Sequence, residues 1–435
     1  MWKLIKILLA GMVFSMFYFP FEFTFLPGYN TKKILAVVGA LFVVYNCIKS
    51  HRIKIPRDVV SIVIFASIVS VIGLISVVYN GTPDYVYATY IISMLVWLSA
   101  AYASVSIIKI VHGKINIRLL CNYIITICVV QCVLAQMIDS MPSFKNYIDT
   151  YIEQGQIFLN EVDRLYGIGA NLDVAGSRFA AALILIVCIL STQDTYETTR
   201  EALYILSFIV IAVLGSMIAR TTYVGGIVAG VFLILNGKLW NFIITKRNLK
   251  IFVLILLLLS VSIPVFVHLY NTDPQVHKMI RFAFEGFFNL AETGEWSIAS
   301  NERLKTMYVF PDNLKTWIIG DGYFNNPVNV DPYYVGEITG GYYKGTDVGY
   351  LRFIFYFGLI GLSAFMLFFI KVTQYCVRGF PKYQWMFILL LIANFVIWLK
   401  VSTDIFLVFA LFLSASNMQD EDPQLSLEPN PELEL

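Results

Sequence analysis

Apolar residues occur in long runs along this chain, and short polar stretches separate the runs. A helix needs about 20 mostly apolar residues to cross a membrane. Segments of nearly that length or more lie near residues 4–20, 33–48, 59–79, 88–110, 118–138, 173–192, 202–218, 221–236, 250–270, 349–371, 383–399 and 402–417. The pattern predicts an all-α polytopic membrane protein with about 12 transmembrane helices.

Two longer polar stretches interrupt this pattern and divide the chain. Helices 1–9 are expected within residues 1–270 and enclose a smaller polar loop at 139–172. A large polar loop follows at 271–348, and the last three helices fill 349–417. The tail at 418–435 is acidic and rich in proline, a composition typical of disordered segments.

Short helices are expected inside the large loop. In QVHKMIRFAFEGFFNL, residues 275–290, apolar residues recur at the spacing of one helix face, which predicts an amphipathic helix. That helix would lie on the bilayer surface or pack on the helix bundle. Further on, Ser300 is the expected N-cap of a second short helix that ends at Pro311.

Basic residues in the short loops predict the orientation, because Lys and Arg are retained on the cytoplasmic side. They gather on one side of a twelve-helix arrangement, at Lys49, Arg52, Lys54, Arg57, Lys109, Lys114, Arg118, Lys238, Lys246, Arg247, Lys250, Lys371, Arg378 and Lys382. The loops at 139–172 and 271–348 then face outward, and the C-terminal tail lies in the cytoplasm.

The composition agrees with a membrane protein and limits which partners, disulfides and metal sites can be expected. The chain is 58% hydrophobic and 14% charged, and its net charge of +2 gives no reason to expect a nucleic-acid partner. The six cysteines lie in or beside apolar runs, which argues against a disulfide framework. The four histidines are scattered, so the sequence predicts no metal site and no cofactor.

Arg220 is the most distinctive charged residue outside the loops. It lies in GSMIARTTYVGG, between two predicted helices too closely spaced for a real loop. Its guanidinium must therefore lie at or just below the outer membrane surface, where a planar fork can bind two phosphate oxygens. The alternative is an arginine whose head simply reaches the interface. Arg178 and Arg352 occupy similar depths at the starts of their helices.

Three motifs carry a resemblance when taken in order. They are GSMIARTTYVGG, SNERLKTMYVFPDNLKTWIIGDGYF and TDVGYLRFIFYFGLIG, and a weaker fourth is RLYGIGANLDVAGSRFAAAL. Together they resemble the O-antigen polymerase and ligase superfamily, and the Wzy-type polymerases of O-antigen or capsule repeat units in particular. The matches cover roughly residues 160–365.

The resemblance implies metal-independent glycosyl transfer at the periplasmic face of a bacterial inner membrane. The donor would be a glycan on undecaprenyl diphosphate, and the acceptor a lipid-linked oligosaccharide repeat unit. Positive charge is needed where the diphosphate leaves, which assigns Arg220 and Arg303 to this group, with Arg281 and Arg164 as second choices. Membrane lipids are further expected partners, and a chain-length regulator is a candidate one.

The acceptor hydroxyl needs a base within hydrogen-bond reach. Asp347 fills the position where ligases of the superfamily usually have His, which favours a polymerase, and its pKa is expected to be raised near the membrane. The alternative is that Asp347 caps the following helix. Tyr323, Trp317 and Tyr343 are candidate residues for stacking on sugars, although interfacial belts also collect such aromatics.

Two other functions remain open from the sequence. One is a ligase or a protein glycosyltransferase of the same superfamily. A transporter of lipid-linked glycans would also fit many helices with arginines near the membrane edge. Transporters usually show two related halves with sites near the bilayer midplane, whereas here the polar residues gather beside one large outer loop.

Overall fold

The computed structural model describes residues 2–50, 57–161, 164–192, 198–235, 264, 267–268, 270–416 and 418. The first five helices are α1 (Trp2–Tyr18), α2 (Thr31–Ser50), α3 (Arg57–Asn80), α4 (Tyr90–His112) and α5 (Ile117–Ser140). The middle of the chain forms α8 (Leu172–Thr192), α9 (Thr198–Ile218) and α10 (Thr222–Leu235), and the last part forms α18 (Gly349–Gly379), α19 (Gln384–Ile397) and α20 (Phe406–Ser416).

These helices coincide with the predicted apolar segments, which confirms an all-α membrane architecture. Seven are long and apolar enough to cross a membrane, namely α2, α3, α4, α5, α8, α9 and α18. The shorter ones are α1, α10, α19 and α20, with 17, 14, 14 and 11 residues. The predicted segment at 250–270 lies mostly outside the described residues, as does the tail from 419, so the count of about 12 helices stays a prediction.

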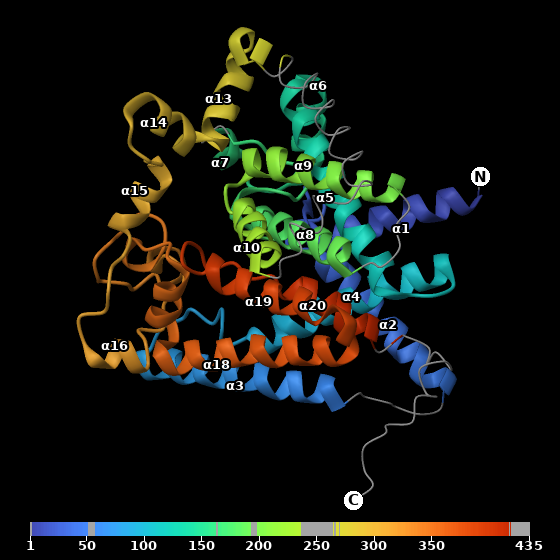
Figure 1. The fold of residues 1–435 in the computed structure, drawn as a ribbon. Helices are drawn as coiled ribbons and strands as arrows, with labels where there is room; N and C mark the ends of the chain where they lie inside the picture. Colours follow the sequence, from blue (N-terminus) through green and yellow to red (C-terminus); the bar gives the residue numbers. More distant parts are fainter. Residues whose placement is uncertain are drawn as a thin grey trace, which may run out of the picture.

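Helix α8 forms the centre of the bundle. Every residue from Ala175 to Ile189 is buried, and the helix packs against α5, α9, α10 and α19 (Figure 1). A helix that is apolar on all sides can lie inside a bundle or face lipid, and the burial of α8 places it inside the bundle.

The smaller loop contains two short helices and half of a small sheet. Helices α6 (Pro142–Tyr151) and α7 (Gln156–Glu161) flank strand β2 (Ile152–Glu153). This strand pairs antiparallel with β1 (Glu22–Phe23), with Glu22 opposite Glu153. The pairing joins the loop to the segment that follows α1.

The large loop contains short helices, as predicted. They are α13 (Pro274–Ala283), α14 (Glu285–Thr293), α15 (Ala299–Thr306), α16 (Leu314–Ile318) and α17 (Pro327–Val330), followed by a 3-10 turn at Tyr343–Gly345. Figure 1 shows α13, α14 and α15 passing along one side of the bundle towards α16 and α18. The predicted amphipathic helix is interrupted at Phe284, which is the N-cap of α14. The predicted cap at Ser300 is wrong, since Ile298 occupies the N-cap position of α15.

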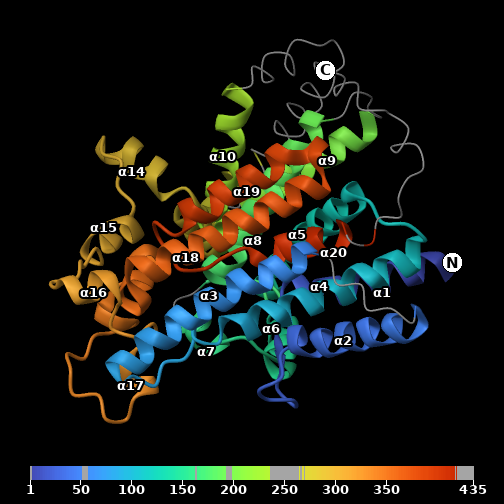
Figure 2. The ribbon, with the colours of Figure 1, turned by 90° about the horizontal axis from the view of Figure 1, so that it is seen from below.

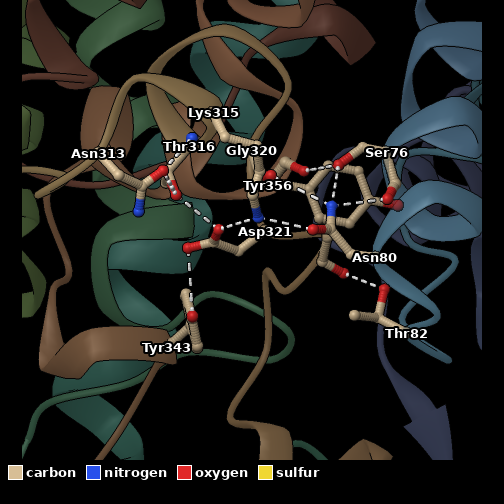
Figure 3. Close-up of polar contacts among 11 residues, drawn as sticks. Ser76, Asn80, Thr82, Asn313, Lys315, Thr316, Gly320, Asp321, Tyr343 and Tyr356 are labelled. Carbon is tan, nitrogen blue, oxygen red and sulfur yellow. Dashed lines mark hydrogen bonds and ion pairs between the residues drawn. The ribbon is translucent and has the colours of Figure 1, made fainter.

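The turn after α16 anchors the large loop to the bundle, as Figure 3 shows. The amide of Asn80, at the end of α3, donates to the carbonyl of Gly320 over 3.1 Å, and the hydroxyl of Thr82 donates to the carbonyl of Gly322 over 2.9 Å. The carboxylate of Asp321 accepts hydrogen bonds from Lys315, Thr316 and Tyr343 at 2.7, 2.7 and 3.2 Å. The turn formed by Gly320, Asp321 and Gly322 therefore has a structural role in this protein.

Helix α18 is kinked where it contacts this turn. Gly358 adopts φ +68° and ψ −174°, a conformation open almost only to glycine. A Cβ at Gly358 would overlap the backbone of Ile318, and one at Gly320 would overlap the backbone of Tyr356. Helix α3 lies along α18 in both views (Figures 1 and 2), so the kink, α3 and the loop hold one another in place.

Candidate functional site

The segment that joins α19 to α20, residues 398–405, forms the base of the candidate site. A helix of 11 or 14 residues is shorter than the roughly 30 Å of a hydrocarbon core. The linker between them is nevertheless packed in protein, since Trp398, Val401 and Ile405 are 0%, 6% and 1% exposed. Non-helical backbone is tolerated at such depth only inside protein or beside a polar cavity. The sequence predicted helices at 383–399 and 402–417 and did not reveal the linker.

Lys400 connects this linker to the start of α8. Its ammonium lies 3.0 Å from the carboxylate of Asp173, a residue in the first turn of α8. The same carboxylate oxygen accepts a hydrogen bond from the hydroxyl of Thr221. Asp173 therefore brings the linker next to the turn between α9 and α10, where Arg220 precedes Thr221.

Arg220 is held against the large loop. Its guanidinium pairs with Glu285 of α14 at 2.6 Å and donates to the hydroxyl of Ser300 at 3.0 Å. Its central carbon lies 4.0 Å from the centre of the Phe282 ring. Its Nε has no hydrogen-bond partner although it is buried. Because the side chain is only 13% exposed, solvent screens its charge little.

Arg164 contacts the same aromatic ring from the smaller loop. Its central guanidinium carbon lies 4.1 Å from the centre of the Phe282 ring. Burial lowers the pKa of Arg164, and the positive charge of Arg220 lowers it further. Two arginines from separate loops thus concentrate positive charge around one phenylalanine of α13.

Arg352 lies on the other side of the linker, in the first turn of α18. Its guanidinium donates to the hydroxyl of Ser402 at 2.6 Å and to the carbonyl of Phe324 at 3.1 Å. The rings of Phe324 and Tyr342 lie 3.8 and 3.4 Å from its central carbon. The side chain is 5% exposed, so Arg352 is a buried residue that links the linker to the large loop.

Asp347 faces this group of charges. Its carboxylate lies 3.9 Å from the guanidinium of Arg352 and is 37% exposed. Burial raises its pKa to about 6 and repulsion by Asp173 adds to the rise, whereas Arg352, Lys400 and Arg303 oppose it. A carboxylate with this pKa takes up and releases protons near neutral pH.

The alternative role of Asp347 as a helix cap is not seen. Helix α18 begins at Gly349, Val348 occupies its N-cap position, and no side chain caps it. The carboxylate is therefore available for another purpose.

The structure separates the other predicted arginines. Arg303 is exposed on α15 and lies close enough to Asp347 to influence its pKa. No described residue forms an ion pair with Arg303. Arg281 instead pairs with Glu292 at 2.6 Å on the exposed side of α13 and α14, and no contact joins it to Arg220.

The predicted aromatic residues pack within the loop. The rings of Tyr323 and Tyr343 lie 5.3 Å apart, the hydroxyl of Tyr323 donates to Asp331, and that of Tyr343 donates to Asp321. The indole of Trp317 donates to the carbonyl of Pro311. Tyr342, another aromatic residue suited to stacking on sugars, is 39% exposed, and its ring lies over the guanidinium of Arg352.

Sequence reasoning missed Asp173, Lys400, Glu285 and Phe282. Asp173 directly precedes an apolar run and Lys400 separates two apolar runs, so charges at such positions were a usable signal. Glu285 and Phe282 gave no signal, because their role depends on how the loop folds back on the bundle.

Comparison of the chain with protein-family models, curated proteins and solved structures finds no match. Within the described residues, no group of three or more His, Cys, Asp or Glu side chains is placed to hold a metal ion.

Proposed function

We propose that this protein is a membrane glycosyltransferase that polymerises lipid-linked oligosaccharides. It would transfer a growing glycan from undecaprenyl diphosphate to a lipid-linked repeat unit of an O-antigen, capsule or exopolysaccharide. The observation that carries this proposal is the carboxylate of Asp347, which lies 3.9 Å from the guanidinium of Arg352 and is 37% exposed, where burial raises its pKa to about 6. The motifs that resemble O-antigen polymerases contain Arg352 and Asp347.

The proposed reaction exchanges one bond at a sugar carbon for another. The acceptor hydroxyl attacks the anomeric carbon of the donor glycan, and its proton passes to the carboxylate of Asp347. The bond from this carbon to the diphosphate oxygen breaks, and undecaprenyl diphosphate leaves with the electron pair. Glycan, proton and lipid diphosphate are all accounted for, and no oxidant or reductant is needed.

The leaving diphosphate gains negative charge, and the arginines would stabilise it. Arg220 and Arg164 offer guanidinium groups around Phe282, and Arg303 is exposed without a partner among the described residues. Fixed positive groups aimed at developing charge are among the strongest sources of catalysis. Glu285 would be displaced from Arg220 by the more highly charged diphosphate.

We assign the active site to the periplasmic side of a bacterial inner membrane. The distribution of basic residues among the short loops supports this orientation. A donor that carries its sugars outside the cytoplasm would meet the site there.

Mass spectrometry of surface glycan from a deletion strain tests the proposal. A polymerase mutant should retain single repeat units on the final acceptor and lose longer chains. Loss of all repeat units would instead identify a transporter, and polymer that stays on undecaprenyl diphosphate and never reaches its final acceptor would identify a ligase.

A further inference from the structure

Lys32 and Arg178 form a second group of cations inside the bundle. The ammonium of Lys32, in the first turn of α2, lies 4.2 Å from the centre of the Trp97 ring. The central guanidinium carbon of Arg178, on α8, lies 6.0 Å from the centre of the same ring and 5.5 Å from that of Phe19. Two positive charges from separate helices therefore meet at one indole of α4.

This second group is separate from the site around Arg220. Arg178 follows Asp173 by five residues on α8, which places it about 7.5 Å further along the helix and about 140° around it. The linker between α19 and α20 reaches both groups. Its Lys400 pairs with Asp173, whereas its Asp404 interacts electrostatically with both cations of the second group.

The positive charges of the second group are not balanced by the described residues. Neither Lys32 nor Arg178 forms an ion pair with a described residue. Arg178 is only 5% exposed, and its Nε is buried without a hydrogen-bond partner. The carboxylate of Asp404, which accepts a hydrogen bond from the amide of Phe406 at 2.9 Å, balances only one of the two charges. Charges within membrane-spanning helices are costly to bury and are typical of binding sites, so this group is suited to bind an anion.

The second group lies towards the end of the bundle that carries the loops. Strand β1 precedes α2 and pairs with β2 of the smaller loop, and Arg178 lies about 9 Å beyond the start of α8 at Leu172. In the proposed orientation this is the outer end, where lysines are disfavoured. Helix α2 nevertheless begins with Lys32 and Lys33, and an anion bound there would account for a lysine that is turned towards Trp97.

We propose that Lys32 and Arg178 bind the diphosphate of the lipid-linked acceptor. This inference rests on the proposed function, because polymerisation needs two lipid-linked substrates and Arg220 with Arg164 is assigned to the donor alone. Ammonium and guanidinium groups both bind phosphate oxygens through charged hydrogen bonds. The two diphosphates would then lie on different sides of α8, and the linker between α19 and α20 would lie next to both.

Binding of undecaprenyl diphosphate to the purified protein, measured by native mass spectrometry, tests this inference. The wild type should bind two molecules per chain. Lys32→Gln should weaken the binding of one of them by about tenfold and leave the other unchanged, and Lys32→Gln/Arg178→Gln should bind a single molecule. Lys33→Gln is the matched control, because Lys33 is exposed and its ammonium donates to the carbonyl of Gly28. It should bind both molecules as the wild type does.

Three outcomes would overturn the inference. The first is that Lys32→Gln binds both molecules with the affinity of the wild type. The second is that Lys33→Gln loses as much binding as Lys32→Gln, which would show an effect of surface charge alone. The third is that an equal concentration of phosphatidylglycerol or of inorganic diphosphate displaces the second molecule, which would identify a site for any phospholipid or for a free anion. If the double variant does not fold, Lys32→Gln, a change at a half-buried residue, decides by itself.

The binding measurement does not depend on polymerisation, so failures of the two proposals can be told apart. A wild-type protein that binds two molecules and makes no polymer would contradict the proposed function and leave the second diphosphate site in place. A protein that polymerises while Lys32→Gln still binds both molecules would contradict the second site alone.

Discussion

Arg164 and Arg220 share one aromatic ring, with their guanidinium carbons 4.1 and 4.0 Å from the centre of the Phe282 ring. The two arginines come from different loops, and the ring comes from a third segment, α13. Aromatic faces attract cations, so the contacts with Phe282 offset part of the repulsion between the two charges. This arrangement keeps a high density of positive charge beside the carboxylates of Asp173 and Glu285.

The orientation of the chain can be tested with single cysteines. Val335 is 99% exposed in the large loop, and Lys382 lies between α18 and α19 at the opposite end of the bundle. With Cys47 changed to Ser, Val335→Cys should react with a membrane-impermeant maleimide in intact spheroplasts, and Lys382→Cys should react only after lysis. The reverse result would contradict the proposed periplasmic site.

Arg220 should be essential for activity in a way that Arg281 is not. Arg220→Ala removes a guanidinium that we assign to the lipid diphosphate, and polymer formation should fall by about tenfold to a hundredfold. Arg220→Lys should rescue little, because an ammonium cannot form a two-point contact. The matched control is Arg281→Ala, since Arg281 pairs with Glu292 away from the site. Equal losses for Arg220→Ala and Arg281→Ala would contradict the assignment.

Much of the fold could be predicted from the sequence, because each long apolar run can be satisfied only by a helix. The pattern singled out Arg220 as a charge between two apolar runs, whereas Asp347 was singled out by the motif resemblance, and the roles of both residues stay predictions. The contacts of Glu285 could not be predicted, since they depend on a loop folding back over the bundle. The linker at 398–405 contains Lys400, Ser402, Thr403 and Asp404, but it was missed because the apolar runs on either side were read as two helices that nearly meet.

The kink in α18 should be needed to hold the large loop. Gly358→Ala places a methyl group against the backbone of Ile318 in a conformation that alanine rarely adopts, and it should destabilise the protein by about 1–3 kcal/mol. Gly340→Ala is the control, because a Cβ there would meet no atom within 4 Å. Thermal unfolding in detergent should give a lower midpoint for Gly358→Ala alone. An unchanged midpoint would show that the loop is not anchored at the kink.

Asp347→Asn separates catalysis from folding. Asparagine has nearly the same shape but cannot accept the proton of the acceptor hydroxyl, and loss of a general base typically costs about a hundredfold to ten-thousandfold in rate. Purified Asp347→Asn should therefore remain folded and make little or no long polymer from lipid-linked repeat units. Asp312→Asn, a change at an exposed carboxylate of the same loop, should polymerise as the wild type does. A near-normal rate for Asp347→Asn would exclude Asp347 as the base.

The pH dependence of polymerisation should report the same carboxylate. Asp347 acts as a base only when deprotonated, so with a pKa of about 6 the rate should rise by about tenfold per pH unit below that value and level off above it. The contribution of Asp347 to the stability of the fold changes with pH in the opposite direction to the rate. Because the folded pKa lies above the ordinary 3.8, the folded protein binds this proton more tightly, and that contribution to stability is lost as pH rises from 3.8 through about 6.

The wild type is assayed for polymerisation between pH 4.5 and about 8. The fraction of folded protein is determined at each pH, so that the rise in rate and the loss of stability are both measured. A rate that stays flat through pH 6 while the protein remains folded would show that no group with this pKa takes up the proton. Any residual activity of Asp347→Asn should lack the acidic limb, because the variant has no carboxyl group at this position. An acidic limb that persists in the variant would assign the titration to another carboxylate of the site, and Asp173, which lies 3.0 Å from Lys400, would be the next to replace.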